Sequence, residues 1–246
     1  MSISTSKEPA KIAGMFDAIA RHYDTLNLVL SAGFDRRWRA RTVAALDLSG
    51  RERLLDMCTG TADLAIEAAT AAGGRAREVV GVDFSSGMLA LGREKVRLAD
   101  LDARVHLARG DATRMPLADG AFDVATVAFG VRNVSDPEQA CREFHRVLKP
   151  GGRLAVLEFG SPVVPGMRTL YLWYFRHVLP LIGRLVSRHG DAYTYLPASV
   201  IEFPSGEGVA AILRRAGFES VRWQTFTFGI VYLYMATKAG KPATPR

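Results

Sequence analysis

Five short apolar runs alternate with helical patterns between residues 53 and 159, and this order restricts the fold more than any other feature of the chain. The runs are RLLDM (53–57), EVVGVD (78–83), RVHLA (104–108), FDVATVAF (122–129) and RLAVLEF (153–159). Strands that alternate with helices form mostly parallel sheets with helices on both faces. Residues 219–227 and 230–237 read as a closing hairpin around Gly229, which adds one antiparallel strand. The sequence therefore predicts an α/β fold.

The composition is that of a folded domain in a reducing compartment. The 246 residues are 48% hydrophobic and 23% charged, which excludes disordered, collagen-like and coiled-coil chains. Cys58 and Cys141 are too few for a disulfide framework, and the sequence has no Cys/His cluster for zinc. The N-terminal residues lack the apolar core of a secretory signal, and no apolar run reaches the roughly 18–20 residues that span a bilayer. We therefore expect a cytoplasmic protein without a metal site.

The pattern predicts an N-terminal helical cap over residues 1–50 and an α/β domain over residues 51–240. The cap would consist of the amphipathic stretches FDAIARHYDTLNLVL and FDRRWRARTVAAL. A helical insertion at about residues 161–205 is too long for a simple crossover. Insertions of this kind usually serve as lids or substrate walls.

The insertion contains an apolar and aromatic segment, Leu170–Val186, which is interrupted by Arg176, His177, Pro180 and Arg184. A segment of this kind can lie on a membrane surface or line an apolar pocket. The alternatives are a buried helix with a kink at Pro180 and a surface covered by a partner subunit.

Acidic residues stand at three strand ends, where an α/β sheet binds its ligand. Asp56 ends the first strand and Gly60 lies in the turn that follows; a carboxylate here repels a pyrophosphate and favours a cationic amino-acid ligand. Asp83 ends the second strand, where a carboxylate accepts both hydroxyls of a ribose. After the third strand, the Asp111 carboxylate can accept from the exocyclic amine of adenine, while the Ala112 N–H donates to a ring nitrogen. For Asp56 and Asp83 the alternative is that the carboxylate only caps a turn or helix.

Two polar residues, Arg132 and Asn133, follow the fourth strand at the mouth of the predicted sheet. The mouth of such a sheet is the expected place for chemistry. The alternative is an arginine that is simply solvated on an exposed loop.

Taken together, these segments resemble a class I S-adenosylmethionine-dependent methyltransferase. The runs LLDMCTGTAD, GVDFSSGML, GDATRMPLADGAFD and FHRVLKPGGRLAVLEF carry the resemblance. More narrowly, the chain is similar to the UbiE/MenG/Coq5 group of quinone-biosynthesis C-methyltransferases, which includes demethylmenaquinone methyltransferases. The narrower match rests on MFDAIARHYDTLNLVLSAGFDRRWR, FGVRNVSD, LEFGSP, YLPAS and AGFES, and covers roughly Met15 to Lys238.

The resemblance implies a Rossmann-like fold with a mostly parallel seven-stranded sheet, one antiparallel strand, and helices on both faces. Residues 51–240 would be the methyltransferase domain. The implied cofactor is S-adenosyl-L-methionine, and the family's cofactor positions fall on Thr61, Asp83 and the pair Asp111–Ala112.

Three positions depart from the pattern. Ala128 stands where the family has a serine that contacts the cofactor, so one side-chain hydroxyl is missing. Cys58 and Ala62 stand where many methyltransferases have glycine.

The implied reaction is methyl transfer to a ring carbon of a polyprenylated quinol, first of all demethylmenaquinol to menaquinol in menaquinone biosynthesis. The alternatives are 2-methoxy-6-polyprenyl-1,4-benzoquinol in ubiquinone biosynthesis and an O- or N-methyltransferase of another small molecule. A phenol with a pKa of about 10 is mostly neutral at pH 7, so the site should stabilise a developing phenolate. Arg132 is the first candidate for this electrostatic role, directly or through a bound water, and Asn133 would orient that water or the ring.

Four further residues are candidates for contact with the substrate. They are His22 and Tyr23 of the N-terminal block, Trp173 of the apolar segment, and Tyr195 of the YLPAS motif. The expected partners are the polyprenylated quinol, the inner face of the cytoplasmic membrane as a peripheral contact, and a second copy in a homodimer.

Two functions other than small-molecule catalysis are alternatives. The net charge of +7 and the basic run Arg36, Arg37, Arg39 and Arg41 suggest nucleic-acid binding. The sequence lacks interleaved aromatic and basic residues, so no nucleic-acid partner is expected. The other reading is a scaffold that binds the cofactor without turnover.

Overall fold

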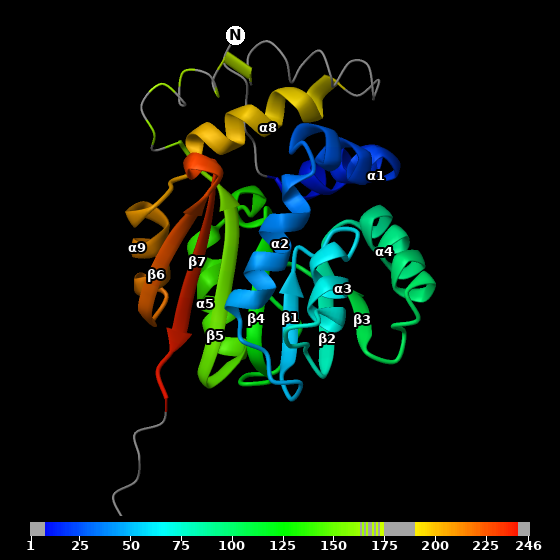
Figure 1. Ribbon diagram of the computed structural model, residues 1–246, viewed down its shortest axis with the longest axis vertical. Helices are drawn as coiled ribbons and strands as arrows, with labels where there is room; N and C mark the ends of the chain where they lie inside the picture. The colour runs from blue at the N-terminus through cyan, green and yellow to red at the C-terminus, as the bar shows by residue number, and fades with distance from the viewer. Residues whose placement is uncertain are drawn as a thin grey trace, which may run out of the picture.

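Seven strands form one sheet in the order β3-β2-β1-β4-β5-β7-β6 in the computed structural model (Figure 1). The structure describes residues 8–162, 164, 166, 169, 171, 173–174 and 190–240. Strand pairs are parallel except those of β7, which runs antiparallel to β5 and β6. The predicted α/β fold with one antiparallel strand is therefore confirmed. The strands are β1 (Arg53–Met57), β2 (Glu78–Asp83), β3 (Val105–Arg109), β4 (Phe122–Ala128), β5 (Leu148–Phe159), β6 (Phe218–Phe226) and β7 (Val231–Lys238).

Helices cover both faces of the sheet, because its central strands are apolar on both sides. One face packs against α2, α3 and α4, and the other packs against α5 and α9. The neighbours Leu54 and Leu55 of β1 belong to opposite faces, as the alternation of side chains along a strand requires. The helices are α1 (Pro9–Leu30), α2 (Phe34–Ala45), α3 (Asp63–Thr70), α4 (Ser86–Leu98), α5 (Pro137–Val147), α8 (Gly190–Glu202) and α9 (Glu207–Arg215).

The fifth strand begins earlier than the sequence predicts. We expected this strand to start at residue 153. Instead α5 ends at Val147, and Leu148 already pairs with Phe122 of β4. The Pro-Gly-Gly turn is a bulge within β5, where Gly151 takes a φ of 78° that favours glycine.

The two N-terminal helices have different places in the fold. Helix α1 lies with α8 across the carboxyl ends of the parallel strands, whereas α2 descends along one face of the sheet (Figure 1). Trp38 and Val43 of α2 are buried in the core of that face. The division into a cap over residues 1–50 and a domain over residues 51–240 stays a prediction, with α1 as the part that covers the strand ends.

Part of the expected insertion at residues 161–205 is described. It includes α8, whereas only Tyr171, Trp173 and Tyr174 of the apolar segment Leu170–Val186 are among the described residues. Across the described ranges, no helix combines the length and apolar character needed to cross a bilayer.

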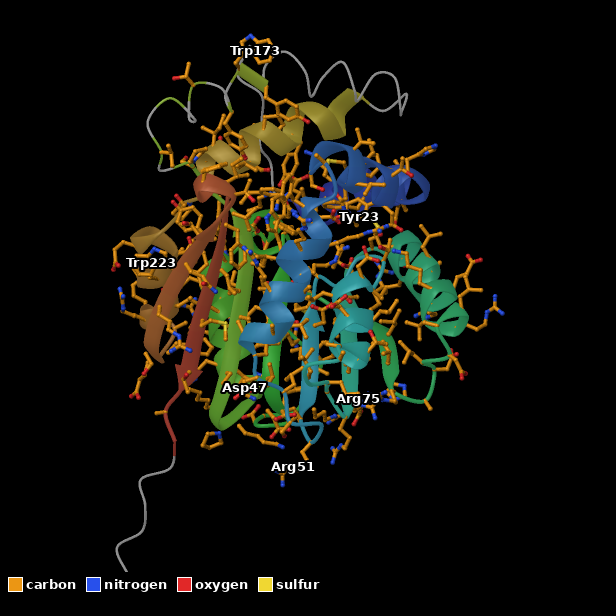
Figure 2. All side chains as sticks on the ribbon, viewed as in Figure 1. Tyr23, Asp47, Arg51, Arg75, Trp173 and Trp223 are labelled. Carbon is orange, nitrogen blue, oxygen red and sulfur yellow. The ribbon has the colours of Figure 1, made fainter. Side chains whose placement is uncertain are left out.

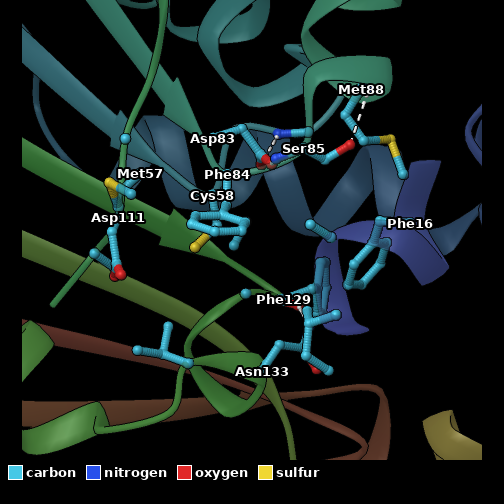
Figure 3. Close-up of a pocket in the computed structure, with 18 of the residues that line it drawn as sticks. Phe16, Met57, Cys58, Asp83, Phe84, Ser85, Met88, Asp111, Phe129 and Asn133 are labelled. Carbon is cyan, nitrogen blue, oxygen red and sulfur yellow. Dashed lines mark hydrogen bonds between the residues drawn. The ribbon is translucent and has the colours of Figure 1, made fainter. Parts of the chain in front are cut away.

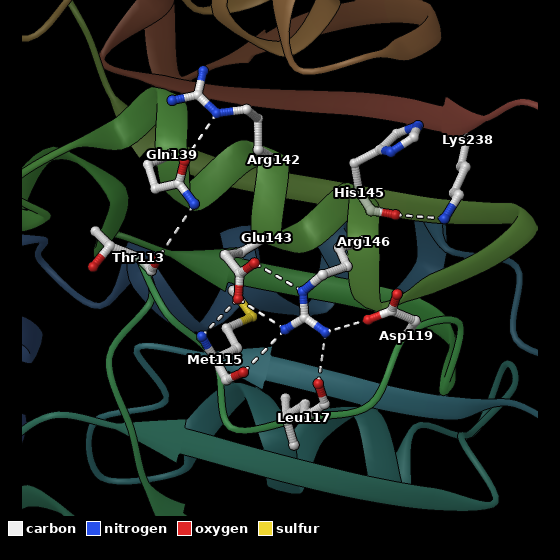
Figure 4. Close-up of polar contacts among 10 residues, drawn as sticks. All are labelled: Thr113, Met115, Leu117, Asp119, Gln139, Arg142, Glu143, His145, Arg146 and Lys238. Carbon is white, nitrogen blue, oxygen red and sulfur yellow. Dashed lines mark hydrogen bonds and ion pairs between the residues drawn. The ribbon is translucent and has the colours of Figure 1, made fainter.

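Arg146 of α5 fixes the loop between β3 and β4 (Figure 4). Its guanidinium donates to the carbonyl oxygens of Leu117 (2.7 Å) and Met115 (3.0 Å) and pairs with Glu143 at 2.8 Å. Glu143 in turn accepts from the Met115 N–H at 2.7 Å. This network holds the loop that follows Asp111, so the end of β3 has a defined position beside the other strand ends.

One carboxylate is buried in the sheet itself. Asp56 of β1 is 1% exposed, and it accepts hydrogen bonds from the hydroxyls of Thr59 (2.6 Å) and Thr126 (2.8 Å). Burial raises the pKa of Asp56 to about 6, and the nearby Asp83 carboxylate contributes to the increase. The two hydroxyls and Arg39 oppose this increase without cancelling it.

We expect Asp56→Asn to stabilise the protein at neutral pH. Between about pH 4 and 6 the folded protein keeps a proton on Asp56 that the unfolded chain has released, so the free energy of unfolding falls as pH rises. Asparagine removes that term, and Thr126 Oγ1 can donate to the Leu55 carbonyl instead, 3.3 Å away. Free energies of unfolding measured by chemical denaturation from pH 4 to 8 should show a gain over the wild type that grows to at most about 3 kcal/mol above pH 6. A gain that does not change with pH would contradict this assignment.

Candidate active site

A pocket opens at the carboxyl ends of β1, β2, β3 and β4, beneath α1 (Figure 3). It encloses about 750 Å³ of empty space, part of it open to solvent, which is the size of a small-molecule site. The described residues that line it include two carboxylates and no lysine, arginine or histidine. Helix α1 and the ends of the four strands all contribute side chains to the lining. They include Phe16 and Tyr23 from α1, Met57, Cys58 and Gly60 at the end of β1, Asp83, Phe84 and Met88 at the end of β2, Asp111 and Ala112 after β3, and Ala128, Phe129 and Asn133 at the end of β4.

The turn after β1 forms one wall because its backbone is tightly folded. Cys58, Gly60 and Ala62 have φ values of 56°, 56° and 66°. Left-handed backbone of this kind is unfavourable for residues with a side chain, by roughly 1–2 kcal/mol each. Cys58 and Ala62 are the two positions where the sequence departs from glycine, so the chain retains the backbone shape at the expense of strain. Burial also raises the pKa of the Cys58 thiol, which keeps it protonated.

Asp83 joins the turns after β1 and β2. Its Oδ2 accepts from the Gly60 N–H and its Oδ1 from the Ser85 N–H, both at 2.8 Å. Burial raises the pKa of Asp83, while these N–H groups oppose the shift. The carboxylate lies on the pocket wall with its position fixed by the two N–H groups (Figure 3), and its contact with ribose hydroxyls stays a prediction.

Asp111 and Ala112 also lie on the pocket wall. Asp111 Oδ1 accepts from both the N–H and the hydroxyl of Thr113 at 2.8 Å, so the side chain is held by a turn. Ala128, where a serine was expected, lines the pocket as an apolar residue.

Two expected cofactor residues have other partners. Asp56 lies behind the pocket wall, in the hydrogen bonds to Thr59 and Thr126. The Thr61 hydroxyl donates to Asp24 of α1 at 2.7 Å and accepts from Lys95 of α4 at 2.9 Å. Neither side chain lines the pocket, and their contact with a cofactor stays a prediction.

Helix α1 is fastened over the pocket by two carboxylates. Asp17 Oδ1 accepts from the Ser85 hydroxyl (2.5 Å) and the Gly87 N–H (2.8 Å) at the start of α4. Asp24 pairs with Lys95 at 2.6 Å, in addition to its bond from Thr61. Neither aspartate was predicted as a functional residue. A signal was present in the sequence, because residues seven apart lie on the same side of a helix.

Arg132 and Asn133 follow β4 in the short 3-10 helix η1 (Val131–Asn133), but only Asn133 lines the pocket. Arg132 is buried, and its Nη1 donates to Glu158 Oε1 and to the Phe129 carbonyl, both at 2.6 Å. Its Nε–H is buried and has no hydrogen-bond partner in the described part of the chain. The guanidinium also lies 5.3 Å from the centre of the Phe159 ring.

Glu158 is the partner that the sequence analysis missed. It is 1% exposed, and it also accepts from the Arg132 N–H (3.3 Å) and the Phe159 N–H (2.9 Å). A carboxylate within the apolar run RLAVLEF was a signal, because an isolated buried charge is too unfavourable to persist without a partner. Arg132 and Glu158 together are formally neutral.

The four candidate substrate residues fall in different places. Tyr23 of α1 lines the pocket, and burial raises the pKa of its hydroxyl. The hydroxyl of Tyr195 in α8 donates to Asn133 Oδ1 at 3.2 Å, which connects the described part of the insertion to the pocket. His22 is exposed and outside the pocket lining. Trp173 is 53% exposed and lies above α8, away from the pocket (Figure 2).

No group of three or more potential metal-binding side chains comes together within the described ranges. The described lining of the pocket combines the held carboxylates of Asp83 and Asp111 with the apolar side chains of Phe16, Phe84 and Phe129.

Solved structures with the same architecture have varied names. One is a [4+2]-cyclase, SpnF, with a TM-score of 0.68 and 20% identity over 93% of this chain and 95% of that one. Another is an S-adenosylmethionine-dependent methyltransferase from Thermotoga maritima, described as a possible histamine N-methyltransferase, with a TM-score of 0.64 and 22% identity over 92% and 99%. At this identity they show the fold alone.

Sequence relatives are much closer. The "Ubiquinone/menaquinone biosynthesis C-methyltransferase UbiE" of Geobacter sp. (strain M21) is 43% identical over 95% of this chain and 98% of its own length. The "Demethylmenaquinone methyltransferase" of Mycolicibacterium vanbaalenii is 44% identical over 96% and 98%. The model of the ubiE/COQ5 methyltransferase family matches residues 4–238. This chain belongs to the ubiE/COQ5 methyltransferase family.

Proposed function

We propose that the protein transfers a methyl group from S-adenosylmethionine to a ring carbon of a polyprenylated quinol, with demethylmenaquinol as the substrate and menaquinol as the product. The observation that carries this proposal is the similarity, over nearly the whole chain, to relatives named for this chemistry. The UbiE name of the Geobacter relative covers both ubiquinone and menaquinone biosynthesis. A 2-methoxy-6-polyprenyl-1,4-benzoquinol is therefore the second candidate substrate.

The pocket fits the proposed cofactor. Two carboxylates and no basic side chain among its described lining residues suit a ligand with positive charge, and they disfavour the pyrophosphate of a nicotinamide dinucleotide. Asp83 would accept the ribose hydroxyls, while Asp111 and the Ala112 N–H would hold the base. The apolar side chains of Met57, Phe84 and Met88 suit a flat ring. When bound, the cofactor supplies a methyl group that its sulfonium already makes electrophilic.

The chain's own contribution to the reaction is to hold the quinol and the negative charge that develops on it. Asn133 lines the pocket and accepts from the Tyr195 hydroxyl, so its amide is oriented between the pocket and α8. Arg132 lies next to it, and its buried Nε–H has no hydrogen-bond partner among the residues that the structure describes. Glu158 balances the charge of the guanidinium, so Arg132 would act by a directed hydrogen bond, or by a water held there, more than by net charge.

The substrate assignment is tested by mass spectrometry of purified protein with S-adenosylmethionine and short-tailed quinols. We expect a methylated product from demethylnaphthoquinol and less from the benzoquinol. More product from the benzoquinol would assign the protein to ubiquinone biosynthesis. Mass spectrometry of the quinones in cells that lack the protein would show which demethylated precursor accumulates. Methylation of neither quinol would overturn the proposal.

Asp83→Ala should lower cofactor affinity at least about tenfold, because it removes charge-assisted hydrogen bonds to the ribose. The substitution also frees the N–H groups of Gly60 and Ser85, so the melting temperature must be measured beside the affinity. Arg51→Ala, exposed at the opposite edge of the sheet, serves as the control. Unchanged affinity by calorimetry in a folded Asp83→Ala protein would remove Asp83 from the site.

Arg132→Gln should destabilise the protein by about 3–5 kcal/mol, because Glu158 remains buried without its partner. The double variant Arg132→Gln with Glu158→Gln should recover most of that stability. Both variants should lose about 10²–10³ in turnover at saturating quinol and keep their cofactor affinity, if the guanidinium acts on the developing phenolate. Wild-type turnover in the double variant would exclude Arg132 from the chemistry.

A further inference from the structure

Exposed apolar side chains gather at one end of the molecule. Among the described residues, nine large apolar side chains are exposed. Only two lie elsewhere. Leu98 is in the last turn of α4, and Trp223 is within β6 (Figure 2). The other seven belong to segments at the carboxyl ends of the parallel strands, where the pocket opens: Leu28, Val29, Phe34, Val164, Trp173, Ile201 and Phe228.

Five of these seven form what we call the apolar rim: Leu28, Val29, Phe34, Ile201 and Phe228. The turn between α1 and α2 lies near the turn between β6 and β7, because Trp38 Nε1 donates to Thr227 Oγ1 at 2.9 Å. The Phe34 ring stacks on Trp38 at 6.3 Å between centroids. Next to Ile201, Val200 is buried in the same cluster as Ile230, which follows the β6–β7 turn. The rim is thus one region built from three distant parts of the chain.

Phe228 is exposed in the turn between β6 and β7. It is 60% exposed, and both Thr227 and Phe228 have left-handed φ values, 48° and 59°. Each such residue costs of the order of 1–2 kcal/mol. Glycine and asparagine adopt this backbone at the least cost, so a large aromatic side chain at the exposed turn points to a contact outside the fold.

Positive charge borders the apolar rim. Arg36 and Arg37 are exposed in the first turn of α2, and neither has an ion-pair partner among the described residues. The Arg37 guanidinium lies 5.7 Å from the centre of the Phe34 ring. Apolar side chains flanked by arginine are the combination that binds an anionic membrane interface, where the rings enter the headgroup region and the guanidiniums pair with phosphates.

We propose that the apolar rim docks on an anionic lipid bilayer and brings the pocket to the membrane surface. This inference rests on the proposed function, because a polyprenylated substrate resides in the bilayer. The rim lies at the carboxyl ends of the parallel strands, where the pocket opens. Docking there would shorten the path of the quinol ring from the membrane to the pocket. It assigns the membrane contact to α1, α2, α8 and the β6–β7 turn.

The apolar part is tested by Val29→Gln combined with Phe228→Asn. Asparagine tolerates left-handed backbone, so this variant should remain folded. Co-sedimentation with vesicles of equal parts phosphatidylcholine and phosphatidylglycerol should show affinity reduced by about tenfold or more. The matched control, Leu98→Gln, removes an apolar side chain that is 72% exposed at the opposite edge and should bind as the wild type does.

The basic part is tested by Arg36→Gln with Arg37→Gln. The matched control is Arg51→Gln with Arg75→Gln, two exposed arginines at the opposite edge of the sheet (Figure 2). Both double variants lower the net charge by the same amount, so a non-specific attraction would weaken equally. We expect only the first to lose about tenfold or more in affinity for these vesicles, and neither to bind vesicles of phosphatidylcholine alone appreciably.

Three outcomes would overturn the proposal: wild-type protein that does not bind the anionic vesicles, equal losses in the rim variants and their controls, or a wild-type dimer in sedimentation velocity that the rim variants dissociate. The last would make the rim an interface between two copies. Turnover of a short-tailed quinol in solution distinguishes a failure of membrane docking from a failure of the proposed function. The rim variants should keep that turnover, whereas failure of the function itself would abolish it in the wild type.

Discussion

The carboxylate of Asp83 is the contact on which the pocket depends. It accepts a hydrogen bond from the Gly60 N–H in the turn after β1 and another from the Ser85 N–H in the turn after β2. These two bonds fix the ends of β1 and β2 relative to each other. The turn after β1 has a left-handed backbone at Cys58, Gly60 and Ala62, which only a firmly held structure tolerates. No cationic side chain pairs with Asp83 in the described part of the chain, so the two backbone N–H groups are what compensates its partly buried charge.

The same turns also hold the covering helix. Asp17 binds Ser85 and Gly87, and Asp24 binds Thr61 and Lys95, so α1 is attached to the residues that follow Asp83 and Gly60. In return α1 contributes Phe16 and Tyr23 to the pocket. The turns after β1 and β2 and helix α1 are therefore joined by hydrogen bonds, so a displacement of either would alter the position of the other.

The side of the pocket that would receive the substrate is organised by a second buried group. Arg132 and Glu158 neutralise each other, and the pair supports η1, from which Asn133 reaches the pocket and Tyr195 of α8. A buried ion pair contributes little net stability compared with apolar residues of the same size. The pair is therefore better explained by what it positions, the η1 backbone and Asn133, than by the stability that it contributes.

The sequence alone determined the order of strands and helices, the single antiparallel strand, and Asp83, Asp111, Ala112 and Asn133 as residues at strand ends, because hydrophobic periodicity and turn residues are local. Only the tertiary structure decided where side chains point and which distant partners they meet. Asp56 faces Thr126 and lies behind the pocket wall, and Thr61 and Arg132 turn to Asp24 and Glu158. A strand end brings a residue to the right edge of the sheet, but the alternation of side chains and the nearest opposite charge determine whether it faces the ligand.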